Sequence, residues 1–301
     1  MKLFFITGAT GFIGKKLLKA VNGEVRLLSR MKQSSYDTVI CDLQSEIIPC
    51  DALNGVDTVI HLAGCAHDIR DEKIIKELYQ KINVDATIAL AKLALESGVK
   101  KFVFISSVKA GGVPLPGQCA SEKDQSFPDG VYGETKREAE LKLLEISKNS
   151  NMQVSIIRPS LVYGPNVKGN LKLMLSAIKK GWFPSLPETG NKRSMIHVDD
   201  LVRAILLVVK YNQKNGEIFI VTDGSFYSSH EIYNTMCQIV GRPEPKWSLP
   251  KIFFDFISLV NPSIKYKVNK LLGDEHYSSR KLEALGFKAN RSLREMNETD
   301  F

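Results

Sequence analysis

Two residues of this 301-residue chain, Tyr132 and Lys136, have a type and spacing that directly suggest chemistry. If their segment is helical, a spacing of four residues places both side chains on one face, about one turn apart. A nearby ammonium group stabilises a phenolate and lowers the tyrosine pKa from its ordinary value of roughly 10. Such a tyrosine can exchange a proton with a hydroxyl or a ketone while a hydride moves to or from a nicotinamide. The same spacing also occurs on ordinary surface helices, so the rest of the chain must decide between these readings.

A second pattern consists of three glycines, Gly8, Gly11 and Gly14, which follow the apolar run of residues 3–6. Gly8 allows a tight turn, Gly11 lets backbone N–H groups approach a pyrophosphate, and Gly14 lets a helix pack close to a strand. The N-terminus of that helix adds unpaired N–H donors and a positive dipole end. This context predicts a dinucleotide site, and the alternative is an ordinary turn between a strand and a helix.

Apolar runs without polar alternation are separated by amphipathic segments, which is typical of a parallel sheet buried on both faces. The predicted strands cover residues 3–6, 24–28, 58–62, 102–106, 154–157 and 217–221. The predicted helices cover residues 13–21, 74–98, 134–148, 171–180 and 199–210. We therefore predict an α/β fold with a Rossmann-type, doubly wound parallel sheet.

The pattern changes after Pro159, where glycine, proline and asparagine become frequent. We predict a dinucleotide-binding domain made of residues 1–165 and 195–225. A smaller, discontinuous substrate lobe is expected from residues 166–194 and 226–301.

The composition is that of an ordinary soluble protein, with 44% hydrophobic and 25% charged residues. No apolar run reaches the roughly 18 residues of a membrane span, and the apolar start of the chain ends at Thr7, so we interpret it as a strand rather than a signal peptide. The formal charge of +8 comes without a dense basic block interleaved with aromatic residues, which argues against a nucleic-acid partner. Five cysteines without a Cys-x-x-Cys pair argue against a disulfide framework or a zinc site. We expect a cytoplasmic protein.

The end of the second predicted strand bears on the choice of dinucleotide. An acidic residue at this position binds the 2′-hydroxyl of NAD, whereas an arginine accommodates the 2′-phosphate of NADP. This chain has Arg30 and Lys32 there and no acid. NADP is therefore the preferred cofactor and NAD the alternative, in which case Arg30 is a solvated surface residue.

The glycine spacing, Ser107, Tyr132 and Lys136, in this order, resemble the extended branch of the short-chain dehydrogenase/reductase family, which contains nucleotide-sugar epimerases, dehydratases and reductases. The resemblance covers most of the chain and is specific up to about Asp200. It implies that Ser107, Tyr132 and Lys136 are catalytic. It also implies that the cofactor is bound by Gly8, Thr10, Gly11, Phe12, Ile13, Gly14, Arg30, Asp42, Leu43, Leu62, Ala63, Gly64, Asn83, Ile105, Ser106, Tyr132, Lys136 and Pro159. His61 is expected to be a structural hydrogen-bonding residue.

The resemblance further implies a substrate site. Ser107, Lys109, Asn170 and Arg193 are the residues expected there, with Asn170 and Arg193 on a diphosphate, for which a forked guanidinium is suited. The alternative for Arg193 is an ion pair with Asp199 or Asp200. Residues 197–200 look like metal ligands, but the family uses this segment for packing and helix capping, so no metal is expected.

Dehydratases of this family place Asp-Glu directly after the catalytic hydroxyl, and this chain has Val108 and Lys109 instead. The leading hypothesis is an NADP-dependent 4-keto reduction of a UDP-hexose or UDP-N-acetylhexosamine in surface-polysaccharide biosynthesis. The first alternative is a UDP-sugar 4-epimerase with tightly held NAD. A non-catalytic, dinucleotide-sensing regulator is a remote alternative, because such proteins usually lose the Tyr or Lys that this chain keeps. The expected partner is a UDP-sugar, without nucleic acid or membrane insertion, and a homodimer is the assembly expected if the chain self-associates.

Overall fold

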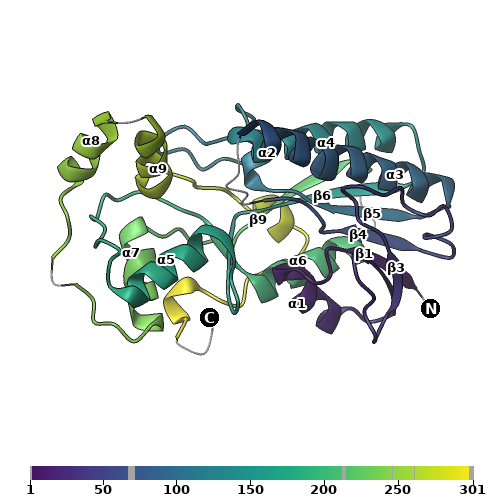
Figure 1. Cartoon of the computed structure of the whole chain (residues 1–301), viewed down its shortest axis with the longest axis horizontal. Coiled ribbons are helices and arrows are strands. Elements are labelled where there is room, and N and C mark those ends of the chain that lie inside the picture. Colours follow the sequence, from purple (N-terminus) through teal and green to yellow (C-terminus); the bar gives the residue numbers. More distant parts are fainter. Residues whose placement is uncertain (1, 67–71, 212–214, 246, 261, 298–301) are drawn as a thin grey trace.

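The computed structural model describes residues 2–66, 72–211, 215–245, 247–260 and 262–297. Its main feature is a seven-stranded, fully parallel sheet with the strand order β3-β2-β1-β4-β5-β6-β9 (Figure 1). The strands are β1 (Leu3–Thr7), β2 (Glu24–Ser29), β3 (Asp37–Ile40), β4 (Thr58–His61), β5 (Lys101–Ile105), β6 (Gln153–Pro159) and β9 (Glu217–Val221). The predicted α/β fold of the Rossmann type is confirmed.

Helices cover both faces of this sheet. Successive residues of each strand point to opposite faces, and apolar side chains lie on both. In β1, Phe4 and Ile6 pack in a cluster with α1 (Phe12–Ala20) and α6 (Val198–Lys210). Phe5 points to the opposite face, towards α3 (Ala86–Glu96) and α4 (Gly130–Lys148). In Figure 1, α3 and α4 lie above the sheet and α1 and α6 lie below it.

Two features of the large sheet and its covering helices differ from the prediction. The edge strand β3 was not predicted, because its four residues include the polar Asp37 and Thr38 and only its middle is half-buried. The single helix predicted over residues 74–98 is divided into α2 (Glu72–Tyr79), a π-helical turn at Gln80–Asp85 and α3.

A smaller lobe follows β6 and lies at the end of the molecule away from β1 (Figure 1). It contains the parallel pair β7 (Leu161–Tyr163) and β8 (Met195–His197), and the helices α5 (Gly169–Lys180), α7 (Ser229–Ile239), α8 (Lys251–Val260) and α9 (Pro262–Leu272). Its core includes Tyr163, Met236 and Phe254. No described helix has the length and apolarity that a membrane span requires.

The short helix α10 (Arg280–Glu283) departs from the predicted division of the chain. We expected residues 226–301 to belong to the substrate lobe, but Leu282 and Phe287 are buried in the cluster below the large sheet. This stretch packs beside β9 because its two apolar side chains complete that cluster.

A buried ion pair fastens α4 to the sheet. Arg158 of β6 donates from Nε to Oε1 of Glu140 at 2.9 Å and from Nη2 to Oε2 at 2.5 Å. Both side chains are at most 2% exposed. Because α4 carries Tyr132 and Lys136, this pair helps to fix the position of the predicted catalytic residues.

Replacing Glu140 with alanine should therefore destabilise the protein strongly, because it leaves a guanidinium buried without its counter-ion. We expect a loss of about 3–5 kcal/mol in the free energy of unfolding, measured by urea denaturation. The control is Glu138→Ala on the same helix, whose carboxylate pairs with Lys142 in contact with solvent. That change should cost no more than about 1 kcal/mol, so equal losses in the two variants would contradict a structural role for the buried pair.

Candidate functional site

In the glycine turn after β1, the backbone packs directly against the backbone of the loop after β4 and against the first turn of α1. Gly8 has φ = +70°, and a Cβ atom there would lie 2.7 Å from the amide nitrogen of Ala63, which follows β4. A Cβ atom on Gly14 would collide with the carbonyl oxygen of Gly8. The hydroxyl of Thr7 accepts a hydrogen bond from the Ala63 N–H at 3.1 Å and joins the two strand ends. The three glycines therefore allow a tight turn and a close approach of α1 to β1 and to the loop after β4, and binding of a pyrophosphate at the start of α1 stays a prediction.

His61, the last residue of β4, is a structural residue, as expected. It is fully buried, with Nδ1 2.7 Å from the hydroxyl of Thr7 and Nε2 2.9 Å from the hydroxyl of Thr87. Burial, aided by the charge of Lys136, lowers the pKa of His61 to about 3. The imidazole is therefore neutral at physiological pH and connects β1 with α3.

Asn83 lies in the π-helical turn and clamps the loop after β4. Its side-chain oxygen accepts from the Cys65 N–H at 2.7 Å, and its amide nitrogen donates to the Cys65 carbonyl at 3.1 Å and to the Thr135 hydroxyl at 3.2 Å. A Cβ atom on Gly64 would lie within 3.1 Å of both Asn83 Oδ1 and Lys136 Nζ. Short π-helical segments often occur at functional sites, and here the turn directs a buried amide towards α4.

The three residues predicted to be catalytic come together at the carboxyl edge of the sheet. Ser107 follows β5 and caps the 3₁₀ turn Val108–Ala110, where its hydroxyl accepts from the Lys109 N–H. Tyr132 lies in the first turn of α4, and its phenol shares a hydrogen bond with Ser107. Lys136 follows one turn later and is 3% exposed.

The pKa of Tyr132 differs from our expectation. Burial and the neighbouring Tyr79 raise it to about 12, and the hydrogen bond with Ser107 opposes this rise only in part. The prediction that Lys136 lowers this pKa is therefore wrong for the protein without ligands. The reason is that the Lys136 ammonium donates to the Ile105 carbonyl at 3.0 Å and lies 4.5 Å from the centre of the Phe104 ring.

Burial also acts on Lys136 itself. It lowers the pKa of this ammonium to about 8, although the charges of Glu140 and Cys65 act in the opposite direction. A buried lysine whose pKa is lowered this far is a candidate functional residue.

The remaining residues predicted to bind the cofactor follow the same edge. Arg30 is exposed directly after β2, and Asp42 and Leu43 are half-buried shortly after β3. Pro159 is buried at the end of β6. Ser106 is also buried, and its hydroxyl has no hydrogen-bond partner among the described residues. An unsatisfied buried hydroxyl and a glycine cradle without side chains fit a polar cofactor at this edge.

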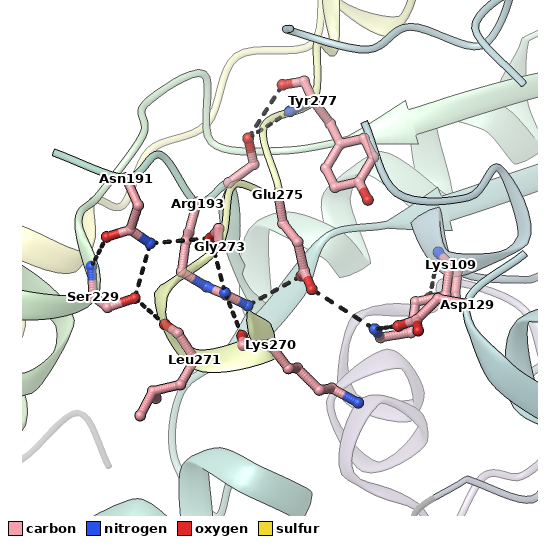
Figure 2. A network of polar contacts seen from close by, with 12 residues as sticks. Lys109, Asp129, Asn191, Arg193, Ser229, Lys270, Leu271, Gly273, Glu275 and Tyr277 are labelled. Carbon is pink, nitrogen blue, oxygen red and sulfur yellow. Dashed lines mark hydrogen bonds and ion pairs between the residues drawn. The ribbon is translucent and has the colours of Figure 1, made fainter. Parts of the chain in front are cut away.

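The residues predicted to bind substrate are only partly brought together (Figure 2). Arg193 is 3.0 Å from Glu275, whose other oxygen is 3.8 Å from Lys109. Lys109 also pairs with Asp129, and although burial acts to lower the pKa of Lys109, Glu275 and Asp129 raise it. Asn170 is exposed in the first turn of α5.

The alternative that we considered for Arg193 was an ion pair, and the structure shows one with a different partner. Asp200 pairs with Arg203 instead, and Asp199 pairs with Lys16. Both acids lie in the first turn of α6, where Asp200 also accepts from the N–H groups of Asn290 and Arg291.

Sequence reasoning missed Glu275 and Asp129. Glu275 lies 82 residues from its partner Arg193, so no local pattern could have joined them. Asp129 was detectable in principle, since it is the N-cap of α4, three residues before Tyr132.

Residues 197–200 serve in packing and capping, as the resemblance implied. His197 is buried, and its Nδ1 accepts from the Asp199 N–H at 3.2 Å at the start of α6. Across the described ranges, no group of three or more His, Cys, Asp or Glu residues is arranged to hold a metal ion.

Comparison with known proteins identifies the family of this chain. Residues 4–222 match the model of the NAD dependent epimerase/dehydratase family. The chain belongs to this family. The prediction of an NAD(P)-dependent nucleotide-sugar enzyme of the extended short-chain dehydrogenase/reductase family is thereby confirmed, and the preference for NADP stays a prediction.

Two relatives of this chain are named as 4-epimerases. A UDP-glucose 4-epimerase of Vibrio cholerae is 34% identical over 260 residues, covering 83% of this chain and 78% of the relative. The N-acetyl-alpha-D-glucosaminyl-diphospho-ditrans,octacis-undecaprenol 4-epimerase of Escherichia coli O157:H7 is 27% identical over 306 residues, covering 96% and 91%. The solved structure of MoeE5 in complex with UDP-glucose and NAD has a TM-score of 0.76 at 24% identity and covers 97% of this chain and 95% of its own. At that identity, the structural likeness supports the fold alone.

The buried Lys136 ammonium generates a prediction about stability. Lys136→Met should raise the free energy of unfolding of the ligand-free protein at neutral pH by up to about 3 kcal/mol, because one unit of pKa shift corresponds to about 1.4 kcal/mol. The pKa of Lys136 is about 8 in the folded protein, below its ordinary value of 10.5. The wild type therefore carries the full penalty below about pH 8 and loses it as the pH rises towards about 10.5.

Urea denaturation of both proteins at about pH 7 and about pH 10 measures this difference, which should shrink at the higher pH. The control Lys142→Met removes an ammonium on the solvent side of α4 and should not stabilise the protein. A difference between Lys136→Met and the wild type that does not depend on pH would contradict the explanation.

Proposed function

We propose that this enzyme epimerises carbon 4 of a UDP-linked hexose or N-acetylhexosamine with the help of a bound nicotinamide dinucleotide. The observation that carries the proposal is the grouping of Ser107, Tyr132 and Lys136 beside the glycine turn. The names of two relatives, both 4-epimerases, favour epimerisation over the 4-keto reduction that the sequence alone placed first.

The dinucleotide would be held by the glycine turn at its pyrophosphate and by the loop after β4, and it would accept and return a hydride at carbon 4. The chain itself must move a proton at the oxygen of carbon 4. Tyr132 holds its proton at neutral pH in the ligand-free protein, which suits donation to a keto oxygen. Removing a proton from the hydroxyl requires the phenolate, and the Lys136 ammonium would have to turn from the Ile105 carbonyl towards Tyr132 in order to stabilise it. Ser107, hydrogen-bonded to the phenol, would orient the reacting oxygen.

The 4-keto reductase is the second candidate, and Arg30 is the observation that favours it. Arg30 is exposed at the end of β2, where a guanidinium would accommodate the 2′-phosphate of NADP. Epimerisation returns the cofactor to its starting state, so it requires no added reduced dinucleotide. Incubation with UDP-glucose or UDP-N-acetylglucosamine, with product analysis by NMR, distinguishes the two reactions. Formation of the 4-epimer without added NADPH supports the epimerase, and turnover only of a 4-keto sugar with stoichiometric NADPH consumption supports the reductase.

Tyr132→Phe should reduce turnover by at least about 100-fold, because general acid–base groups typically contribute 10²–10⁴-fold. Dinucleotide affinity should stay within a few-fold, since the glycine turn is untouched. Steady-state kinetics and a fluorescence titration measure the two effects. The control is Tyr79→Phe, which keeps the ring that packs edge-on against Tyr132. A loss below about tenfold in Tyr132→Phe would exclude this residue as the proton-transfer group.

Arg30 gives a separate prediction about the cofactor. If Arg30 binds the 2′-phosphate, as the reductase candidate requires, the wild type should bind NADPH more tightly than NADH, and Arg30→Asp should reverse this order, because a carboxylate repels the 2′-phosphate and accepts from the 2′-hydroxyl. Calorimetric titration with both dinucleotides measures the ratio. Lys19→Asp, an equal change of charge at the far end of α1, serves as the control and should leave the order unchanged. A wild type that prefers NADH would remove Arg30 from the site and would strengthen the epimerase proposal.

A further inference from the structure

Charged residues from distant parts of the chain meet in one network (Figure 2). Glu275, which follows α9, lies between two cations. One of its oxygens is 3.0 Å from Nη2 of Arg193, and the other is 3.8 Å from Nζ of Lys109. These three side chains are between 10% and 23% exposed, so solvent screens their interactions less than it would at the surface.

The network carries more positive than negative charge. Three cations, Lys109, Arg193 and Lys270, face two carboxylates, Asp129 and Glu275. The pKa of Lys270 is lowered, first by burial and then by the charges of Lys109 and Arg193, although Asp129 and Glu275 act in the opposite direction. An additional anion would relieve this excess charge.

We propose that Glu275 is an internal counter-ion that occupies the anion position at Arg193 and Lys109, and that the diphosphate of the substrate displaces it on binding. Glu275 is then a specificity-determining residue, because a ligand must offer more negative charge than one carboxylate in order to replace it. This inference rests on the proposed function, since it assumes a diphosphate-linked sugar.

The surroundings of Arg193 allow such an exchange without rebuilding the site. Nη1 of Arg193 donates to the carbonyl oxygens of Lys270 at 2.7 Å and Gly273 at 3.4 Å, so the guanidinium stays anchored when Nη2 changes partner. The amide of Asn191 donates to the Gly273 carbonyl at 3.1 Å and to the Ser229 hydroxyl at 3.0 Å, which holds the same loop from the other side.

The main chain of Glu275 is also fixed. Its N–H donates to the carbonyl of Lys192 at 2.8 Å, and its carbonyl accepts from the N–H of Ser194 at 2.9 Å. Only the carboxylate side chain must therefore rotate. A planar guanidinium held in this way is preorganised for a phosphate, whose oxygens it can bind in place of the carboxylate.

The test is the variant Glu275→Gln, which removes the competing charge and keeps the size of the side chain. It should bind UDP and inorganic pyrophosphate at least about fivefold more tightly than the wild type, and uridine should bind equally to both, because the competition is purely one of charge. Glu217→Gln, which breaks an ion pair with Lys281 away from the network, is the matched control. Isothermal titration calorimetry on the full chain measures all three ligands.

Arg193→Ala separates this proposal from the proposed function. This variant should weaken UDP binding at least about thirtyfold, as expected for loss of a buried phosphate partner, without changing the affinity for NADPH. Suppose that Arg193→Ala weakens UDP binding as expected while Glu275→Gln binds UDP no more tightly than the wild type. That result would overturn the role of Glu275 and leave the proposed function standing. Failure of the wild type to bind UDP would overturn the nucleotide-sugar assignment, and tighter pyrophosphate binding by Glu275→Gln would still support the counter-ion.

A measurement on the wild type covers the case in which Glu275→Gln does not fold. A crystal structure with UDP bound should show Nη2 of Arg193 on a phosphate oxygen and the Glu275 carboxylate turned away from it. A structure in which the Arg193–Glu275 pair persists beside bound UDP would overturn the proposal.

Discussion

The close approach of backbone to backbone at the carboxyl edge of β1 and β4 is the constraint on which this site depends. Gly8 lies against Ala63, and Gly14 lies against Gly8, at separations that leave no space for a side chain. This approach sets how near α1 and the loop after β4 come to each other. The hydroxyl of Thr7 and the imidazole of His61 then bond the same strand ends together, which places Asn83 and α4 relative to the glycine turn.

The site also holds two groups in protonation states that burial disfavours or enforces. The Lys136 ammonium lies under Gly64 and against Phe104, where burial opposes its charge. The neighbouring Tyr132 phenol is likewise held in its neutral form by burial. A bound ligand that contacts both groups would change these balances, so the ligand-free protein and the working complex need not share the same proton positions. The buried Arg158–Glu140 pair provides the rigidity that this arrangement requires.

The elements that could be predicted from sequence are those with local patterns. The apolar runs of the central strands, the three glycines of the turn and the spacing of Tyr132 and Lys136 all lie within short segments, and the structure brings them to one edge of the sheet. The features that escaped prediction depend on contacts between distant segments. Examples are the π-helical turn that buries Asn83, the direction of the Tyr132 pKa shift and the pairing of Arg193 with Glu275.

The pairing of β7 with β8 has a consequence for how this protein can change over evolution. The two strands are parallel neighbours, with Leu161 opposite Met195, so the chain leaves and re-enters the sheet-bearing part at nearly the same point. Residues 164–194 therefore form a closed excursion, and the entropic cost of lengthening such a loop grows only slowly with its length. Insertions and deletions in this excursion can reshape the smaller lobe while the strand register and the positions of Ser107, Tyr132 and Lys136 stay the same. Change in the smaller lobe is thus separated from change in the large sheet within one polypeptide.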